Sequence, residues 1–412
     1  MKKRIIALAL GALLTLSGGC RLITVDEEKA AALDNAKILI EYKDIDINKE
    51  AVTLKMNADL AQQGMTIADL SERNDTSTWD SFRESIIKEM AAMQIALEKA
   101  AELGLDKLTD EEVALIDENY STLKTSVESN VEFYVQMAVD NDSSLNYDEE
   151  YQRQLEAYYN MIGYKADTCR EQMEKEFIFD KVWDHYTKDI TVTDQEVKDS
   201  YDSSLNIQKS NISIDPKMIE TQLSFSGQAL YYPEGYMKAR HILIRFDAET
   251  RSAATAAYGK DDTTEYDSII AKALPTIQSK LDDIKTRLEA GEDFSALMDE
   301  YNEDTAFIIE PYKSEGIVRG PYSNVDIPGY LDAMAKLTNE SQYSEPVITY
   351  DGAYIIQCVK PLAGEIPFED VKEKMTASMI ASNKETEWYN VSNGWIDAAL
   401  ADGTLKMFPD KY

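Results

Sequence analysis

The sequence predicts an α+β protein, with a helical first half and a second half that combines helices with a small antiparallel sheet. All ten prolines of the 412-residue chain lie at or beyond Pro216. Only three glycines lie between Cys20 and Asp215. Proline and glycine interrupt helices, so a long stretch that is nearly free of both favours long helices. Further along, Asp351-Gly352 separates two apolar runs, which predicts a β-hairpin.

The composition limits the class of protein. A chain of this length is long enough for about two to four domains. Apolar residues make up 44% of the chain, which supports packed cores and excludes wholesale disorder. The 42 basic and 76 acidic residues give a net charge of −34. Because binding to a nucleic-acid backbone requires a local excess of Lys and Arg, we expect no nucleic-acid partner.

The first twenty residues have the layout of an export signal. Lys2, Lys3 and Arg4 precede an apolar run over residues 5–16, which is shorter than the roughly 20 residues that span a membrane. Small residues then precede Cys20, and this arrangement resembles a bacterial lipobox, although Ser17 holds the usual aliphatic position. We expect residues 1–19 to be a lipoprotein signal peptide, with acylation of Cys20 anchoring the chain at the extracytoplasmic face of the cell membrane. The alternative is a plain cleaved signal with an incidental cysteine.

Apolar periodicity and capping motifs define helices in the first half. Thr109 with Glu112, and Thr193 with Glu196, have the spacing of capping boxes that open helices. Residues that recur every three or four positions predict one buried helical face: Phe82, Ile86, Met90, Met93 and Leu97. A second face is predicted from Leu123, Val127 and Val131. Such apolar stripes favour ordinary core over a binding groove.

The sequence predicts no metal site and no cofactor. The chain has two histidines and no paired-cysteine motif, which argues against zinc. Residues 44–48 open like a calcium loop, but Lys49 and Lys55 stand where glycine and the bidentate glutamate are required. P-loop, dinucleotide-binding and nucleophile-elbow motifs are absent from the sequence.

Two cysteines remain beyond the lipobox. A disulfide between Cys169 and Cys358 is an open alternative in an exported protein. Two isolated buried thiols are the favoured interpretation, since nothing in the sequence brings these residues together.

The second half contains short strands and amphipathic helices in alternation. Residues 231–244 predict a turn and a strand, and residues 247–267 predict a polar insert. Residues 292–297 begin a further helix. Two helical faces are predicted, one from Ile277, Leu281, Ile284 and Leu288, and one from Phe368, Val371, Met375 and Met379.

Five short blocks in this half resemble one family. They are residues 239–244 (Ala-Arg-His-Ile-Leu-Ile), 291–294 (Gly-Glu-Asp-Phe), 301–304 (Tyr-Asn-Glu-Asp), 344–347 (Ser-Glu-Pro-Val) and 351–356 (Asp-Gly-Ala-Tyr-Ile-Ile). In this order and spacing, over residues 235–361, they resemble the parvulin-type peptidyl-prolyl isomerases in the arrangement of lipid-anchored, PrsA-like foldases. The region ending in residues 193–201 resembles the SurA- or trigger-factor-like helical chaperone segment of such proteins.

The resemblance implies a set of site residues. His241 matches the first histidine of the family, Asp304 the residue near the substrate carbonyl, and Thr349 a hydroxyl that supports the histidine network. Tyr354 stands where the family has its second histidine, and its hydroxyl is expected to orient His241. The implied substrate pocket comprises Tyr330, Ile317, Val318 and Met334, although residues 315–320 depart from the usual Gly-Gly-Asp-Leu-Gly run.

The resemblance also implies the domain order. We expect a helical chaperone domain over residues 20–229, an inserted isomerase domain over residues 230–362, and C-terminal helices over residues 363–412 that pack on the chaperone lobe. The expected partners are unfolded exported polypeptides, with a homodimer through the helical lobe as one assembly.

Three functions stay open at this point. The first is a membrane-anchored prolyl isomerase that assists the folding of secreted proteins. The second, motivated by the replacement of the second histidine by Tyr354, is a non-catalytic holdase with a degenerate isomerase domain. The third, a solute-binding surface lipoprotein, is disfavoured because two-lobed solute binders need repeated βα units, which the proline-free half lacks.

Overall fold

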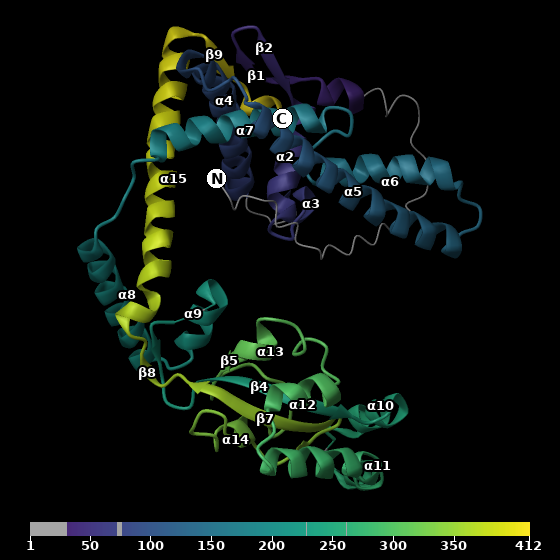
Figure 1. Ribbon diagram of the computed structural model, residues 1–412. Coiled ribbons are helices and arrows are strands. Elements are labelled where there is room, and N and C mark those ends of the chain that lie inside the picture. The colour runs from purple at the N-terminus through teal and green to yellow at the C-terminus, as the bar shows by residue number, and fades with distance from the viewer. Residues whose placement is uncertain (1–30, 72–75, 228, 261) are drawn as a thin grey trace. The chain divides into compact units, whose positions relative to one another are not determined.

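The computed structural model describes residues 31–71, 76–227, 229–260 and 262–412 (Figure 1). The predicted signal peptide and Cys20 lie outside the described residues. The predicted α+β class is confirmed. The chain forms two compact units, one that combines the residues up to Thr191 with Ile380–Tyr412, and one that comprises Val192–Met379. The second unit thus includes residues 192–229, which were expected to belong to the chaperone domain.

The first unit is mainly helical. The capping box of Thr109 and Glu112 forms as predicted, and it opens α5. Leu123, Val127 and Val131 of α5 pack against Tyr159, which confirms their predicted helical face. The helices are α2 (Lys49–Ala61), α3 (Ile67–Ser71), α4 (Thr76–Leu103), α5 (Asp110–Asn141), α6 (Tyr147–Met161), α7 (Cys169–Thr187) and the second part of α15 (Phe368–Asp402).

A three-stranded sheet in this unit shows that the prediction of an all-helical first half was wrong. β1 (Ile38–Tyr42) and β2 (Ile45–Asn48) form a hairpin, and β9 (Leu405–Met407) pairs with the other edge of β1. The turn places Lys43, rather than glycine, at a positive φ of 53°, so the usual turn signal is missing. The third strand comes from the far end of the chain, beyond the reach of a local pattern.

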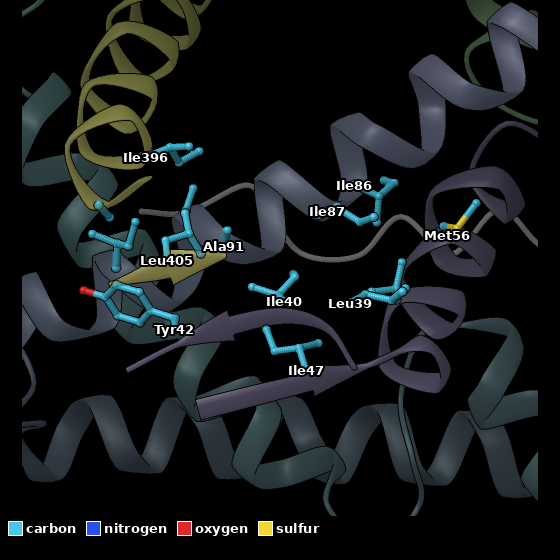
Figure 2. Packing of buried hydrophobic residues seen from close by; sticks show 14 residues of the cluster. Leu39, Ile40, Tyr42, Ile47, Met56, Ile86, Ile87, Ala91, Ile396 and Leu405 are labelled. Atoms are coloured by element: carbon cyan, nitrogen blue, oxygen red, sulfur yellow. The ribbon is translucent and has the colours of Figure 1, made fainter. Parts of the chain in front are cut away.

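The sheet is buried by helices from both ends of the chain (Figure 2). Ile40 and Leu405 lie in one apolar cluster with Ile86 and Ile87 of α4 and Ile396 of α15. This cluster joins the N-terminal hairpin to the C-terminal segment within one core. After β9 the chain ends in a short 3-10 helix, Pro409–Lys411.

The second unit is built around an antiparallel sheet in the order β5-β4-β7-β6 (Figure 1). The strands are β5 (Ile317–Arg319), β4 (Met237–Arg245), β7 (Gly352–Pro361) and β6 (Val347–Ile348). A second, two-stranded ladder pairs β3 (Tyr231–Tyr232) with β8 (Gly364–Glu365). The helices are α8 (Asp194–Ile214), α9 (Met218–Ser226), α10 (Ala248–Ala257), α11 (Thr264–Glu289), α12 (Phe294–Tyr301), α13 (Tyr312–Glu315), α14 (Tyr330–Met334) and the first part of α15.

Two apolar clusters lie on the sheet. Ile242 and Ile355 belong to a cluster with residues of α11 and α12, including Phe294. Leu243 and Ile356 belong to a second cluster with residues of α14. Since successive strand residues point to opposite faces, these clusters put α11 and α12 on one face of the sheet and α14 on the other.

Several local predictions are confirmed in this unit. The capping box of Thr193 and Glu196 opens α8, and the Asp351-Gly352 turn joins β6 to β7. At Gly352, φ is +149° and a Cβ would lie 2.1 Å from the carbonyl oxygen of Ile244, so only glycine fits this close approach.

Two other segments contain secondary structure that the sequence did not specify. Residues 247–267, expected to be a polar insert, contain α10 and the beginning of α11. The C-terminal region, expected to contain several helices, has a single long helix, α15, followed by β9 and a 3-10 turn. One helix is formed because no proline interrupts residues 368–402.

Cys169 and Cys358 are both buried, unpaired thiols, which confirms the favoured interpretation of these cysteines. Within the described ranges, no helix is long and apolar enough to cross a membrane. The same residues contain no cluster of His, Cys, Asp and Glu that is suited to a metal ion.

Candidate functional site

The site is built where β4 continues past the end of β5. β5 pairs only with residues 237–239 of β4, so the edge of β4 is free of β5 at Leu243. There the Leu243 N–H donates to the Asn302 side chain over 2.8 Å, and the Glu303 N–H donates to the Leu243 carbonyl over 2.9 Å. The Asn302 side chain also accepts from the N–H of Asp304 over 3.2 Å. These bonds fix the loop after α12 against β4 and place Asp304 beside His241.

His241 lies at the centre of a short chain of hydrogen bonds. Its Nε2 lies 3.0 Å from Oδ2 of Asp304, and its Nδ1 lies 3.1 Å from the hydroxyl of Tyr330. Burial lowers the pKa of His241, partly opposed by the carboxylate of Asp304. The hydrogen bond from His241 holds the pKa of Asp304 below its usual range. The pair therefore consists of a neutral imidazole and an ionised carboxylate near neutral pH.

These protonation states define the donors. An ionised carboxylate only accepts hydrogen bonds, so the proton between His241 and Asp304 is on Nε2. In a neutral imidazole the other nitrogen is an acceptor, so the hydroxyl of Tyr330 donates to Nδ1. Burial raises the pKa of Tyr330, which keeps this hydroxyl protonated.

Aromatic rings enclose the imidazole. The ring centroid of Phe307 lies 4.1 Å from that of His241, and the rings of Tyr354 and Tyr330 meet it edge-on at 5.1 Å and 5.7 Å. The His241 side chain is only 4% exposed, whereas that of Asp304 is 24% exposed. Asp304 is therefore the end of the hydrogen-bonded chain that faces solvent.

Two predicted members of the polar cluster bond elsewhere. The hydroxyl of Thr349 donates to the Gly352 carbonyl over 3.2 Å and accepts from the Asp351 N–H over 3.1 Å, and these bonds close the β6–β7 turn. The hydroxyl of Tyr354 donates to Asp351 over 3.3 Å. The hydrogen bond that was expected between Tyr354 and His241 is made by Tyr330 instead. Tyr354 contacts the imidazole only through the edge of its ring.

The predicted substrate-binding residues do not form one wall. Tyr330 and Met334 are buried in the core between α14 and the sheet. Ile317 packs with the cluster that contains Phe307, whereas Val318 packs with Tyr232 and Tyr236 in a different cluster. Consecutive strand residues point to opposite faces, so of these two only Ile317 joins the cluster that contains Phe307.

Arg240 is a residue of the site region to which the sequence assigned no role. This buried guanidinium donates to Gln357 over 2.8 Å, to the hydroxyl of Ser295 over 2.6 Å and to the carbonyl of Lys313 over 2.8 Å. Burial lowers the pKa of Arg240. By joining β4 to β7, to α12 and to α13, Arg240 fixes the strand position next to His241. A basic residue directly before His241, within the predicted strand, was the signal that could have revealed it.

No family model matches the chain. A foldase protein PrsA from Clostridium acetobutylicum is 20% identical over 403 residues, which cover 97% of this chain and 96% of that protein. A foldase protein PrsA from Caldanaerobacter subterraneus is 27% identical over 264 residues, which cover 63% and 62%.

Among solved structures, that of PrsA from Bacillus subtilis aligns with 89% of this chain and 93% of its own, at 15% identity and a TM-score of 0.26. The curated relatives match the sequence in both of its units. The chain is thus similar over nearly its whole length to proteins named foldase protein PrsA, which confirms the PrsA-like resemblance that its motifs indicated.

Proposed function

We propose that this protein is an extracytoplasmic foldase that binds unfolded exported polypeptides and catalyses cis/trans isomerisation of X–Pro bonds beside Asp304 and His241. The hydrogen-bonded chain Asp304–His241–Tyr330 carries the proposal. It is a buried polar arrangement, and only its carboxylate end faces solvent. The likeness to PrsA foldases supports the same reaction class.

The reaction needs only selective binding of a twisted amide. Rotation about an X–Pro bond faces a barrier of roughly 18–20 kcal/mol and takes tens to hundreds of seconds unaided. A site accelerates it by binding the twisted amide better than the planar one. No bond is made or broken and no cofactor takes part, so fixed charges and hydrogen bonds suffice.

The carboxylate of Asp304 has the charge that this selection requires. Resonance in a planar amide puts negative charge on the carbonyl oxygen, and twisting returns the electrons to nitrogen. An anion held beside the carbonyl therefore repels the twisted form less than the planar form. Asp304 is held by Nε2 of His241 on one oxygen and by the N–H of Ala306, over 3.0 Å, on the other, so its position is fixed before a substrate arrives.

The test compares the two histidines of the chain in an X–Pro peptide isomerisation assay. We expect His241→Ala to slow isomerisation roughly tenfold or more, because Asp304 loses its hydrogen-bond donor. The matched control is His185→Ala, which alters the other histidine, on α7 of the first unit, and should leave the rate unchanged. Equal rates for the two variants would remove His241 from the mechanism.

A non-catalytic holdase is the second candidate function, and one observation favours it. The ring of Phe307 packs on that of His241 at a tilt of 40°, and the imidazole is almost fully enclosed, so a proline ring has little direct access to it. Suppression of client aggregation by a protein with no measurable isomerase activity would favour this function over catalysis.

Exposed apolar side chains support client binding in both candidates. On α5, Phe133 is 65% exposed, and the side chains of Tyr134 and Met137 beside it are also exposed. Contiguous exposed apolar surface marks interaction sites. With a net charge of −34, the protein attracts apolar segments that carry basic residues. Replacing Phe133 and Met137 by serine should weaken the suppression of aggregation without changing isomerisation of a short peptide.

The anchor and the oligomeric state belong to the same proposal. Acylation of Cys20 would hold the mature chain at the extracytoplasmic face of the membrane. Cys20→Ser should release the protein from the membrane fraction and abolish palmitate labelling; retention of both would contradict the anchor. Light scattering of the purified protein tests whether two copies associate through the helical lobe.

A further inference from the structure

We propose that Tyr330 is the positioning residue that holds His241 in its Nε2–H tautomer, a role that the family resemblance placed at position 354. The inference rests on the proposed function for its catalytic meaning. In this protein the phenol of Tyr330 takes the place of a second imidazole, and it reaches His241 from α14 rather than from β7.

The geometry around Tyr330 leaves its hydroxyl aimed at the imidazole. Tyr330 begins α14, directly after Gly329, which has a φ of 72° that favours glycine. Met334 and Leu337 pack in the same cluster as Tyr330 and hold this segment against the sheet. With its ring buried and its hydroxyl 3.1 Å from Nδ1 of His241, Tyr330 is fixed by packing before any substrate binds.

The hydrogen-bond partners of His241 specify one tautomer. The carboxylate of Asp304 requires a proton on Nε2. If Nδ1 carried the single proton instead, Nε2 would present a lone pair to the carboxylate, and the hydroxyl of Tyr330 would lose its acceptor. Both contacts therefore favour the same form of the ring, in a site too buried for water to compensate a lost bond.

Tyr354 does not perform this task because other residues hold its hydroxyl. That hydroxyl donates to Asp351 over 3.3 Å. Asp351 also pairs with Arg245 and Arg251, at 3.4 Å and 3.3 Å. Tyr330 and Tyr354 thus have identical chemistry and similar ring contacts with His241, but only the hydroxyl of Tyr330 reaches Nδ1.

This difference makes a matched pair of variants. In a His185→Gln background, selective 15N labelling of histidine leaves His241 as the only labelled residue. In the parent protein we expect Nδ1 to give a shift of the unprotonated type and Nε2 a shift of the protonated type. Tyr330→Phe should reduce the excess of the Nε2–H tautomer about fivefold, which corresponds to the loss of one hydrogen bond of about 1 kcal/mol. It should also raise the pKa of His241. Tyr354→Phe should change neither quantity.

Identical spectra for Tyr330→Phe and its parent would overturn the proposal. If Tyr330→Phe does not fold, the parent spectrum still decides, since a predominant Nδ1–H tautomer is incompatible with donation from Tyr330. Isomerase rates of the same samples separate this inference from the proposed function. A tautomer shift in a protein without isomerase activity would refute catalysis and support the positioning role. An active isomerase whose tautomer is the same in Tyr330→Phe and in the parent would support catalysis and refute the positioning role.

Discussion

The two sheets of this protein bury different kinds of side chain. The β2-β1-β9 sheet of the first unit is closed by apolar contacts among residues such as Ile40 and Leu405. The β5-β4-β7-β6 sheet of the second unit buries Arg240, His241 and Gln357 among its apolar residues. Buried polar groups cost free energy unless they are paired, so a sheet that contains several paired ones is the better candidate for a functional site.

This contrast teaches that the sheets have separate tasks. The first sheet joins the two ends of the chain into one lobe. Truncation of its buried side chains should lower the free energy of unfolding of that unit. The second fixes a hydrogen-bonded site, and its changes should be measured as altered protonation or rate.

Truncation in the first sheet should destabilise its own unit and leave the site unchanged. Ile40→Ala should lower the free energy of unfolding of the first unit by about 3 kcal/mol, because it leaves a cavity in a core that joins β1, α4 and α15. Urea unfolding followed by tryptophan fluorescence measures this unit selectively. All four tryptophans lie within it: Trp79, Trp183, Trp388 and Trp395.

The matched control for this cavity is Ile45→Ala. Ile45 lies in the same hairpin, but its side chain is exposed, so we expect a change within about 0.5 kcal/mol. If Ile40→Ala alters the 15N shifts of His241, the two sheets are coupled and the division is wrong.

Removal of the charge on Asp304 should slow isomerisation. Asp304→Asn keeps the shape of the side chain and an acceptor for Nε2 of His241, but it removes the anion beside the substrate carbonyl. We expect roughly a tenfold slower isomerisation, equivalent to about 1.4 kcal/mol. Asp299→Asn, on α12, removes an exposed carboxylate that pairs with Lys313 and should leave the rate unchanged. Equal rates for Asp304→Asn and the parent would refute the electrostatic role.

The buried imidazole should make the second unit sensitive to acid. The folded state lowers the pKa of His241 below 6.5, chiefly through burial, so folding favours the neutral ring. The corresponding stability is present above pH 6.5 and is lost as the pH falls below it, by at most about 1.4 kcal/mol per pH unit. Hydrogen exchange of the β4 amides at pH 7 and pH 5 measures this loss, and His241→Gln should reduce it.

The charged and titratable groups around His241 do not reverse the expected loss of stability in acid. Arg319 and Arg245 lower its pKa further, and Asp304 opposes them only in part. The pKa of Asp304 is itself lowered, so its own contribution to stability is lost only below about pH 4. Burial raises the pKa values of Tyr330 and Tyr354, and both stay neutral over this range. An unchanged acid sensitivity in His241→Gln would contradict the assignment.

Restoration of the missing family histidine should have the smallest effect. Tyr354→His places an imidazole at position 354, but Nδ1 of His241 already accepts from Tyr330. We expect the isomerase rate to change less than about twofold. A tenfold gain in the peptide assay would show that the tyrosine at position 354, and not the enclosure by Phe307, limits the site.

Features with local physical causes were predictable from the sequence. The capping boxes at Thr109 and Thr193 and the turn at Gly352 depend on residues within a few positions of one another. The pair of His241 and Asp304 was also found, because the motifs around both residues carry the family resemblance. Their hydrogen bond of 3.0 Å is present in the structure.

Features set by tertiary packing were not predictable. The pairing of β1 with β9 joins residues more than 360 positions apart. The choice between Tyr330 and Tyr354 as the partner of His241 depends on how α14 packs on the sheet and on the pairing of Asp351 with two arginines. Neither the apolar pattern nor the residue type distinguishes the two phenols.

The two buried thiols have a practical consequence for labelling. Burial raises the pKa of Cys169 to about 12 and raises that of Cys358. Because the thiolate is the reactive form, burial keeps both thiols protonated and unreactive near neutral pH. Once Cys20 is acylated or replaced, a single cysteine engineered at the surface would be the preferred target of maleimide dyes. A protein labelled in this way would allow client binding to be measured by fluorescence.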